Sequence, residues 1–227
     1  TIDAKSFSKE STLHLALVHY GLEQLKELQQ EAEKLDRDHA GTTLPQAVYA
    51  WLGTKLAKEE RFEEAWRFLP RAVTADQPDE TVTGVWLAHA RAAFATGNFT
   101  EATNSYSILL NREENAFRQA EYHYHLALCW HARGNNGKAT TEAEDALALK
   151  PQGELNGRIR LLLGKLAAGG GDTDTALQHY VVVAELFADD PETRSEALTR
   201  AIAVLEARGN PEDLTQAEEY RKALNTP

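Results

Sequence analysis

A period of 37 residues runs through most of this chain and constrains its fold more than any other feature. Alanine marks the period at four positions: Ala65, Ala102, Ala139 and Ala176. A short turn precedes each alanine, and three of these turns contain glycine, at Gly97, Gly134 and Gly171. The turn before the first alanine, residues 60–64, has no glycine. Self-similarity at a fixed spacing of roughly 20–50 residues is the signature of a repeat fold.

Apolar residues recur around each alanine at helical spacing. The positions four and seven residues after the alanines are Leu69 and Ala72, Tyr106 and Leu109, Ala143 and Ala146, and Tyr180 and Val183. A second apolar pattern precedes each turn: Tyr49, Leu52, Gly53 and Leu56; Trp86, Ala90 and Ala93; Leu126, Ala127 and Trp130; Leu163, Gly164 and Ala167. Each period therefore predicts two amphipathic helices joined by a tight turn.

This pattern resembles the tetratricopeptide repeat. The third unit supplies the family's positions in register: Leu126, Gly134, Ala139, Ala143, Ala146 and Pro151. The family repeat usually has about 34 residues, so this chain carries about three more in each unit. The resemblance implies an all-α fold, a right-handed superhelical solenoid of antiparallel helix pairs. Repeats of this length are similar to those of bacterial cell-envelope tetratricopeptide proteins, which implies the bacterial periplasm or cell envelope, with the cytoplasm as the alternative.

The resemblance covers residues 46–224 and divides them into about five units: 46–82, 83–119, 120–156, 157–193 and 194–224. The fifth unit is degenerate, but Asn210 before Pro211 is a good helix start, and Asp190 before Pro191 gives the same signal one helix earlier. Residues 1–45 lack the turn signature. We expect them to form helices that pack on or cap the repeats, although residues 13–18 also alternate as a strand would.

Composition narrows the classes of function. The net charge is −11, which disfavours a phosphate-binding surface and therefore nucleic acid. No apolar run approaches the length of a transmembrane helix. A single cysteine, Cys129, permits no internal disulfide. The chain begins at Thr1 without a signal-peptide layout and has no Met, so we expect a trimmed or processed form.

The repeat architecture predicts a binding surface and not a catalytic site. Stacked units form an extended concave face, and the resemblance implies that the first helix of each pair lines it. The residues expected there are Lys58, Leu87, Arg91, Phe94, Tyr124, Leu128, His131, Arg158 and Lys165. Apolar anchors beside cations suit a peptide or protein segment, including an acidic one. The alternative is that these cations pair with acids on neighbouring helices. Chaperone-tail receptors of this family hold a C-terminal carboxylate with a set of Lys and Asn residues. The matching positions of this chain lack that set.

The sequence offers no motif for a catalytic residue or a cofactor site. Gly137-Lys138-Ala139 lacks the hydroxyl of a phosphate loop, and Gly169-Gly170-Gly171 lacks the layout of a dinucleotide site. A short segment holds His123, His125, Cys129 and His131. His125 and Cys129 share a helix face, but we favour structural roles over a metal site.

Two other functions compete with peptide binding. Leu25, Leu28 and Leu35 form a short heptad seam through which the chain would associate with itself as a structural subunit of an assembly. Packing of this helix on the first repeat is the alternative, because the seam has only about two heptads. An enzyme has no motif in its favour. The sequence also leaves open whether residues 1–20 fill the groove.

Overall fold

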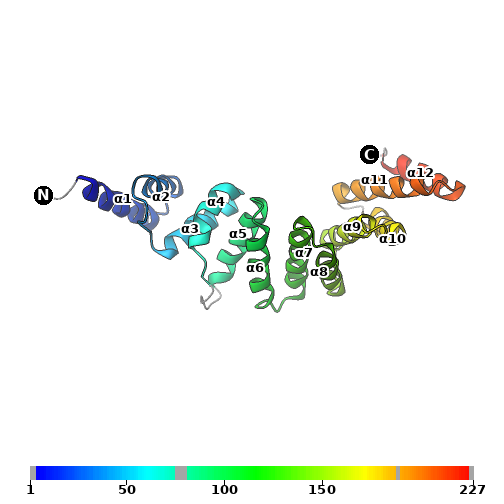
Figure 1. The fold of residues 1–227 in the computed structure, drawn as a ribbon, viewed down its shortest axis with the longest axis horizontal. Helices are drawn as coiled ribbons and strands as arrows, with labels where there is room; N and C mark the ends of the chain where they lie inside the picture. Colours follow the sequence, from blue (N-terminus) through cyan, green and yellow to red (C-terminus); the bar gives the residue numbers. More distant parts are fainter. Residues whose placement is uncertain (1–3, 75–80, 188–189, 225–227) are drawn as a thin grey trace. The chain divides into compact units, whose positions relative to one another are not determined.

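The fold is all-α. The computed structural model describes residues 4–74, 81–187 and 190–224, and every regular element within them is helical. The α-helices, labelled in Figure 1, are α1 (Ala4–Gly21), α2 (Leu25–Asp38), α3 (Gln46–Lys58), α4 (Phe62–Phe68), α5 (Thr81–Ala95), α6 (Phe99–Leu110), α7 (Ala116–Ala132), α8 (Asn136–Ala148), α9 (Glu154–Gly169), α10 (Thr173–Leu186), α11 (Pro191–Arg208) and α12 (Pro211–Leu224). A single 3-10 turn, η1 (Leu69–Arg71), follows α4.

The helices pack in consecutive pairs, as the repeat pattern predicts. Each odd-numbered helix contacts the even-numbered helix that follows it, across a short turn. The chain divides into two compact units, unit 1 from Thr1 to Leu109 and unit 2 from Leu110 to Pro227. The division of residues 46–224 into five repeats stays a prediction.

The turn inside each repeat requires a left-handed residue. Gly97, Gly134 and Gly171 have φ of 77°, 76° and 85°. The equivalent residue in the first repeat is Glu60, which has φ of 59° despite its side chain. Glycine adopts this conformation without a steric penalty and glutamate does not. The repeat geometry therefore holds even where the sequence lacks the preferred residue.

The predicted core positions are buried. All four marker alanines are fully buried, and Tyr106 and Tyr180, four residues after two of them, are 1% exposed. Small residues allow the close approach expected within a pair, because a Cβ at Gly164 would collide with the ring of Tyr180. Trp130 and Ala167 are exceptions, because both are only partly buried. The cationic groups of Arg133 and Lys138 lie 4.4 and 4.2 Å from the ring centroid of Trp130.

Helix α4 is shorter than the repeat pattern predicts. The pattern continues through Ala72, but the α-helix ends at Phe68 and gives way to η1. Pro70 explains this difference, because proline has no N–H to donate and its ring clashes with the preceding turn. Leu69 and Ala72 remain fully buried.

Residues 4–38 form the helix pair α1–α2, so residues 13–18 are helical as predicted. Leu28 and Leu35 are 0% and 1% exposed and belong to the core of unit 1. The seam expected to join two copies is therefore covered by the chain's own core, and the prediction of self-association through Leu25, Leu28 and Leu35 is corrected. The Arg71 guanidinium donates to both carboxylate oxygens of Asp36, at 2.6 and 2.8 Å, and so ties α2 to η1.

Both predicted helix starts in unit 2 are confirmed. The Asp190 carboxylate accepts a hydrogen bond from the Thr193 backbone N–H at 3.1 Å, and Pro191 is the first residue of α11. The Asn210 side chain accepts from the Asp213 N–H at 2.9 Å ahead of α12. Each cap satisfies one of the N–H groups that a helix start leaves without a partner. Within the described ranges, none of the helices has the length and apolarity that a bilayer crossing requires.

Candidate functional site

The first helices of the unit 2 pairs gather four of the predicted groove residues at one pocket. Tyr124 and Leu128 lie on α7, whereas Arg158 and Lys165 lie on α9. All four line a pocket of about 380 Å³, which α11 closes on its third side. The remaining lining residues are Leu161, Leu162, Glu192, Thr193 and Glu196. We call this pocket the α7–α9–α11 groove.

A second pocket of about 400 Å³ adjoins the groove, because Tyr124 and Arg158 line both. It runs along α7 and α9 toward the start of α9 and includes Phe117, whose side chain is 53% exposed. Together the two pockets form a longer surface for an extended partner segment than either pocket alone.

The cations of the groove already have acidic neighbours. Arg158 Nη2 lies 3.1 Å from Glu154 Oε2 on its own helix, and Arg158 Nε lies 3.5 Å from Asp190 Oδ2 at the start of α11. Lys165 Nζ lies 2.7 Å from Glu196 Oε1 on α11. The alternative considered from the sequence, pairing with acids on neighbouring helices, therefore holds for both cations. The groove is positive along α9 and negative along α11, with no net excess among its lining residues.

Tyr124 sits at the centre of this arrangement. Burial raises the pKa of its phenol, and the nearby Arg158 lowers it less than burial raises it. The phenol therefore stays protonated at neutral pH and can donate a hydrogen bond. Its ring packs on the unit 2 core that contains Ala139 and Ile159, so the tyrosine is held in place by apolar contacts.

The other predicted groove residues lie elsewhere. His131 is exposed at the end of α7, where its Nδ1 lies 2.9 Å from Asn136 Oδ1, and it lines neither unit 2 pocket. Lys58 is exposed at the end of α3. Leu87, Arg91 and Phe94 lie on α5, where Phe94 packs edge-on against Phe99 at 5.5 Å. These residues belong to unit 1 and are not gathered at a pocket described for that unit.

The structure does not bring the predicted metal candidates together. Cys129 is fully buried, whereas His131 is exposed. His123 instead meets two acids of α8: its Nδ1 lies 2.8 Å from Glu142 Oε2, and the ligand atoms of His123, Glu142 and Asp145 lie within 4.8 Å of one another. One imidazole and two carboxylates can hold a divalent cation, but the His123–Glu142 hydrogen bond accounts for this cluster. Sequence reasoning missed it because the acids come from the second helix of the pair.

The N-terminal helices form a pair of their own within unit 1. Helix α1 packs against α2, and the described residues that line the unit 1 pocket come from neither helix. Their apolar surface is not fully covered, since Leu15 and Val18 on α1 and Leu22, the residue after its end, are 42%, 53% and 61% exposed.

No protein-family model matches the chain, and no curated protein matches its sequence. Solved structures do match its fold. The similar structures include YrrB, described as a TPR protein with an unusual peptide-binding site, with a TM-score of 0.58 and 18% identity over 80% of this chain and 87% of YrrB. PilF of Pseudomonas aeruginosa matches with a TM-score of 0.59 and 14% identity over 98% of this chain and 92% of PilF.

A signal-transduction ATPase of Pyrococcus horikoshii with a tetratricopeptide repeat sensor matches 95% of this chain with 35% of its own, at a TM-score of 0.63 and 15% identity. Identities this low establish the fold alone. The chain has the all-helical fold of the tetratricopeptide repeat proteins.

Proposed function

We propose that this chain, which has the tetratricopeptide-repeat fold, is a non-catalytic interaction module that binds a segment of another protein in the α7–α9–α11 groove. The observation that carries the proposal is the convergence of Tyr124, Leu128, Arg158 and Lys165, which the repeat register assigns to the first-helix face, at one pocket. Residues from three helices line that pocket, as a site for an extended partner requires.

The lining chemistry favours a segment with an apolar anchor and polar flanks. Leu128, Leu161 and the ring of Tyr124 provide the apolar floor. Large apolar anchors in desolvated pockets supply most of the affinity in protein interfaces. The charges beside this floor have both signs, with Lys165 facing Glu196 across the groove. A purely acidic segment, the partner considered from the sequence, would gain from Arg158 and Lys165 but would be repelled by Glu192 and Glu196.

Two further considerations support the proposal. YrrB, which has the same fold, is described as having a peptide-binding site. The repeat length also supports a location in the bacterial periplasm or cell envelope, with the cytoplasm as the alternative. At that location, a module of this kind would act as a scaffold.

The proposal is tested with peptides selected on the wild-type chain from a displayed random library. The affinity of the best peptide is then measured by titration calorimetry for the wild type and for Leu128→Gln/Arg158→Gln. We expect at least a tenfold weaker affinity for the double variant, because it loses an apolar contact and a charged hydrogen-bond donor, each contributing about 1 kcal/mol or more.

A matched control changes the same residue types outside the groove. Leu186→Gln/Arg118→Gln alters two exposed residues of unit 2 that line neither pocket. This control is expected to keep the wild-type affinity, and circular dichroism checks that both variants stay helical. Equal affinities of the wild type and the groove variant would place the binding site elsewhere.

The second candidate function is an oligomerising structural subunit. The observation in its favour is an exposed apolar surface formed by Leu15 and Val18 of α1 and by Leu22, which follows the helix. This surface would join two copies in place of the seam on α2, which is buried. Light scattering of the purified chain separates the two functions. A molar mass near 25.2 kDa, that of one chain, would remove the oligomer as the working form.

A further inference from the structure

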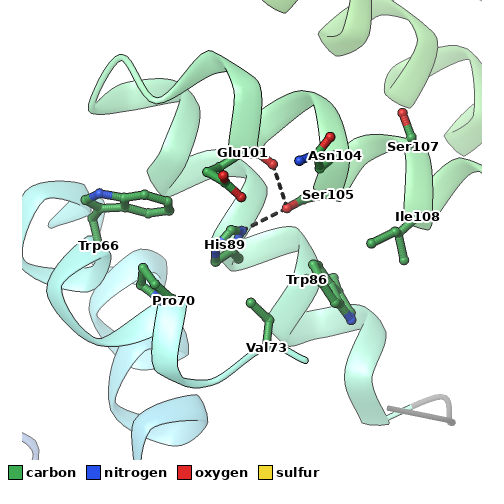
Figure 2. A pocket seen from close by; sticks show the side chains of 10 residues that line it. All are labelled: Trp66, Pro70, Val73, Trp86, His89, Glu101, Asn104, Ser105, Ser107 and Ile108. Atoms are coloured by element: carbon green, nitrogen blue, oxygen red, sulfur yellow. Dashed lines mark hydrogen bonds between the residues drawn. The ribbon is translucent and has the colours of Figure 1, made fainter. Parts of the chain in front are cut away.

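Unit 1 contains a pocket that the predicted groove does not include. It has a volume of about 740 Å³ and lies between α4, α5 and α6 (Figure 2). Trp66 and Trp86 stand on opposite sides of it, and His89 lies between them. The centroid of the His89 ring is 5.0 Å from that of Trp66 and 5.9 Å from that of Trp86. The pocket therefore has aromatic walls on two sides of an imidazole.

The early end of α4 lies beside this space. Pro70 stops the helix at Phe68, so the α-helix ends before the repeat pattern does. Pro70 and Val73 line the pocket at that place.

The Ser105 hydroxyl lies between the buried histidine and a backbone carbonyl. It donates to the Glu101 carbonyl at 2.9 Å, and its oxygen lies 2.8 Å from His89 Nδ1, which donates to it in the tautomer that carries the proton on Nδ1. Burial lowers the pKa of His89 to about 4, so the ring is neutral at pH 7. The neutral ring then carries a lone pair on Nε2, on the far side from Ser105.

Most polar groups of the pocket present lone pairs to an occupant. The Ser105 proton is engaged as above, and the Ser107 hydroxyl donates to the Thr103 carbonyl at 2.9 Å. His89 Nε2 is an acceptor, and so is the carboxylate of Glu101. The amide of Asn104, which is exposed, can donate as well as accept. A ligand rich in hydrogen-bond donors matches this set.

The charge of the pocket lining is negative. Among the described residues that line the pocket, Glu101 is the single ionised one, since these include no Lys, Arg or Asp and His89 is neutral. Glu101 is exposed, and Figure 2 shows its side chain directed toward the His89 side of the pocket. The described residues include no cation paired with this carboxylate. Acceptors, one negative charge and flat aromatic walls together fit a planar cation.

We propose that this pocket binds an arginine side chain of a partner protein or peptide. The guanidinium would donate hydrogen bonds to the Glu101 carboxylate and to His89 Nε2 and stack on the indole of Trp66. Arginine suits the site better than lysine, because its planar fork of five donors both stacks on aromatic rings and bonds carboxylates with two parallel hydrogen bonds. An acidic chain of net charge −11 further favours a basic partner.

This site is separate from the predicted groove. On α5, Trp86 and His89 point into the pocket, whereas Leu87 and Arg91 belong to the groove stripe. At roughly 100° per residue these two sets lie about 150° apart around the helix. The inference therefore goes beyond the function proposed for the α7–α9–α11 groove, and either site can fail its test without affecting the other.

The test uses the acetylated and amidated tripeptide Gly-Arg-Gly beside the same peptides with citrulline or lysine in place of arginine. Citrulline keeps the shape of arginine and removes its charge. Nuclear magnetic resonance follows the indole N–H signals of Trp66 and Trp86 in the full chain. We expect a saturable shift of the Trp66 signal with the arginine peptide, and at least tenfold weaker binding of the citrulline peptide. The lysine peptide is expected to bind more weakly than the arginine peptide.

Two variants sharpen the test. Glu101→Gln removes a charge at an exposed position, so we expect the fold to stay unchanged. The affinity for the arginine peptide should fall about tenfold. The affinity for the citrulline peptide should stay the same. Glu144→Gln, on an exposed position of α8, is the matched control and keeps wild-type affinity. Equal binding of the arginine and citrulline peptides, no effect of Glu101→Gln, or no saturable shift at Trp66 at about 10 mM peptide would each overturn the proposal.

Discussion

Arg158 Nε lies 3.5 Å from Oδ2 of Asp190, the residue that caps the start of helix α11. Asp190 is 7% exposed and accepts two hydrogen bonds from Thr193, one from the backbone N–H and one from the hydroxyl at 2.6 Å. One carboxylate therefore joins a groove cation of α9 to the first turn of α11. We expect the start of α11 to depend on this contact.

Replacement of Asp190 tests that dependence. Asp190→Ala removes the cap and the partner of Arg158, and we expect the free energy of unfolding to fall by about 1–2 kcal/mol. Asp190→Asn keeps an oxygen that can cap the helix and loses only the charge, so a fall below about 1 kcal/mol is expected. Urea unfolding followed by circular dichroism measures both. If the two variants lost the same stability, the cap would not be the important part of the contact.

His89 predicts a pH dependence of stability. Burial lowers its pKa in the folded chain to about 4, whereas an unfolded chain has the ordinary value of 6.5. The unfolded state therefore binds the proton more readily, and the contribution of neutral His89 is complete above pH 6.5 and is lost as the pH falls toward 4. The loss amounts to about 3 kcal/mol at most.

The measurement compares urea unfolding of the wild type and His89→Asn at pH 7, 6 and 5. Asparagine can still donate to Ser105 but does not titrate, so the stability of the variant should fall less between pH 7 and pH 5. Identical pH profiles for the two proteins would show that protonation of His89 does not oppose folding.

Glu60 offers a stabilising substitution. Its φ of 59° is the left-handed conformation that Gly97, Gly134 and Gly171 adopt in the other repeats. Glu60→Gly should raise the free energy of unfolding by about 1 kcal/mol, because a side chain in this conformation is strained. Glu60→Ala is the control, since it removes the carboxylate and keeps the strained Cβ. A similar gain for alanine would assign the effect to charge and not to backbone conformation.

The sequence predicted the helix pairs because their determinants are local and periodic. The marker alanines, the residues four and seven positions after them and the cap of Asp190 all follow from spacing within one repeat, and the structure buries or caps each as expected. The tolerance of the turn for Glu60 shows that the packing of the pair overrides the preference of one residue.

The candidate sites were less predictable because they depend on contacts between helices. The pairing of Lys165 with Glu196 joins residues 31 positions apart, and no periodic pattern specifies it. The same holds for His123 and Glu142. The pocket of unit 1 had one signal in the sequence, Pro70 inside a segment expected to be helical, since α4 ends before this residue and Pro70 lines the pocket.

Site-directed photocross-linking tests the central claim, that the α7–α9–α11 groove binds a partner segment, most directly. A photoreactive amino acid replaces Leu128 in the groove or, as the control, Leu186, an exposed residue of α10 that lines neither unit 2 pocket. Each protein is irradiated with the peptide selected on the wild-type chain, and mass spectrometry maps the products. The account predicts a cross-link from position 128 to one defined stretch of the peptide and none from position 186. Equal labelling from both positions, or labelling from position 186 alone, would contradict it.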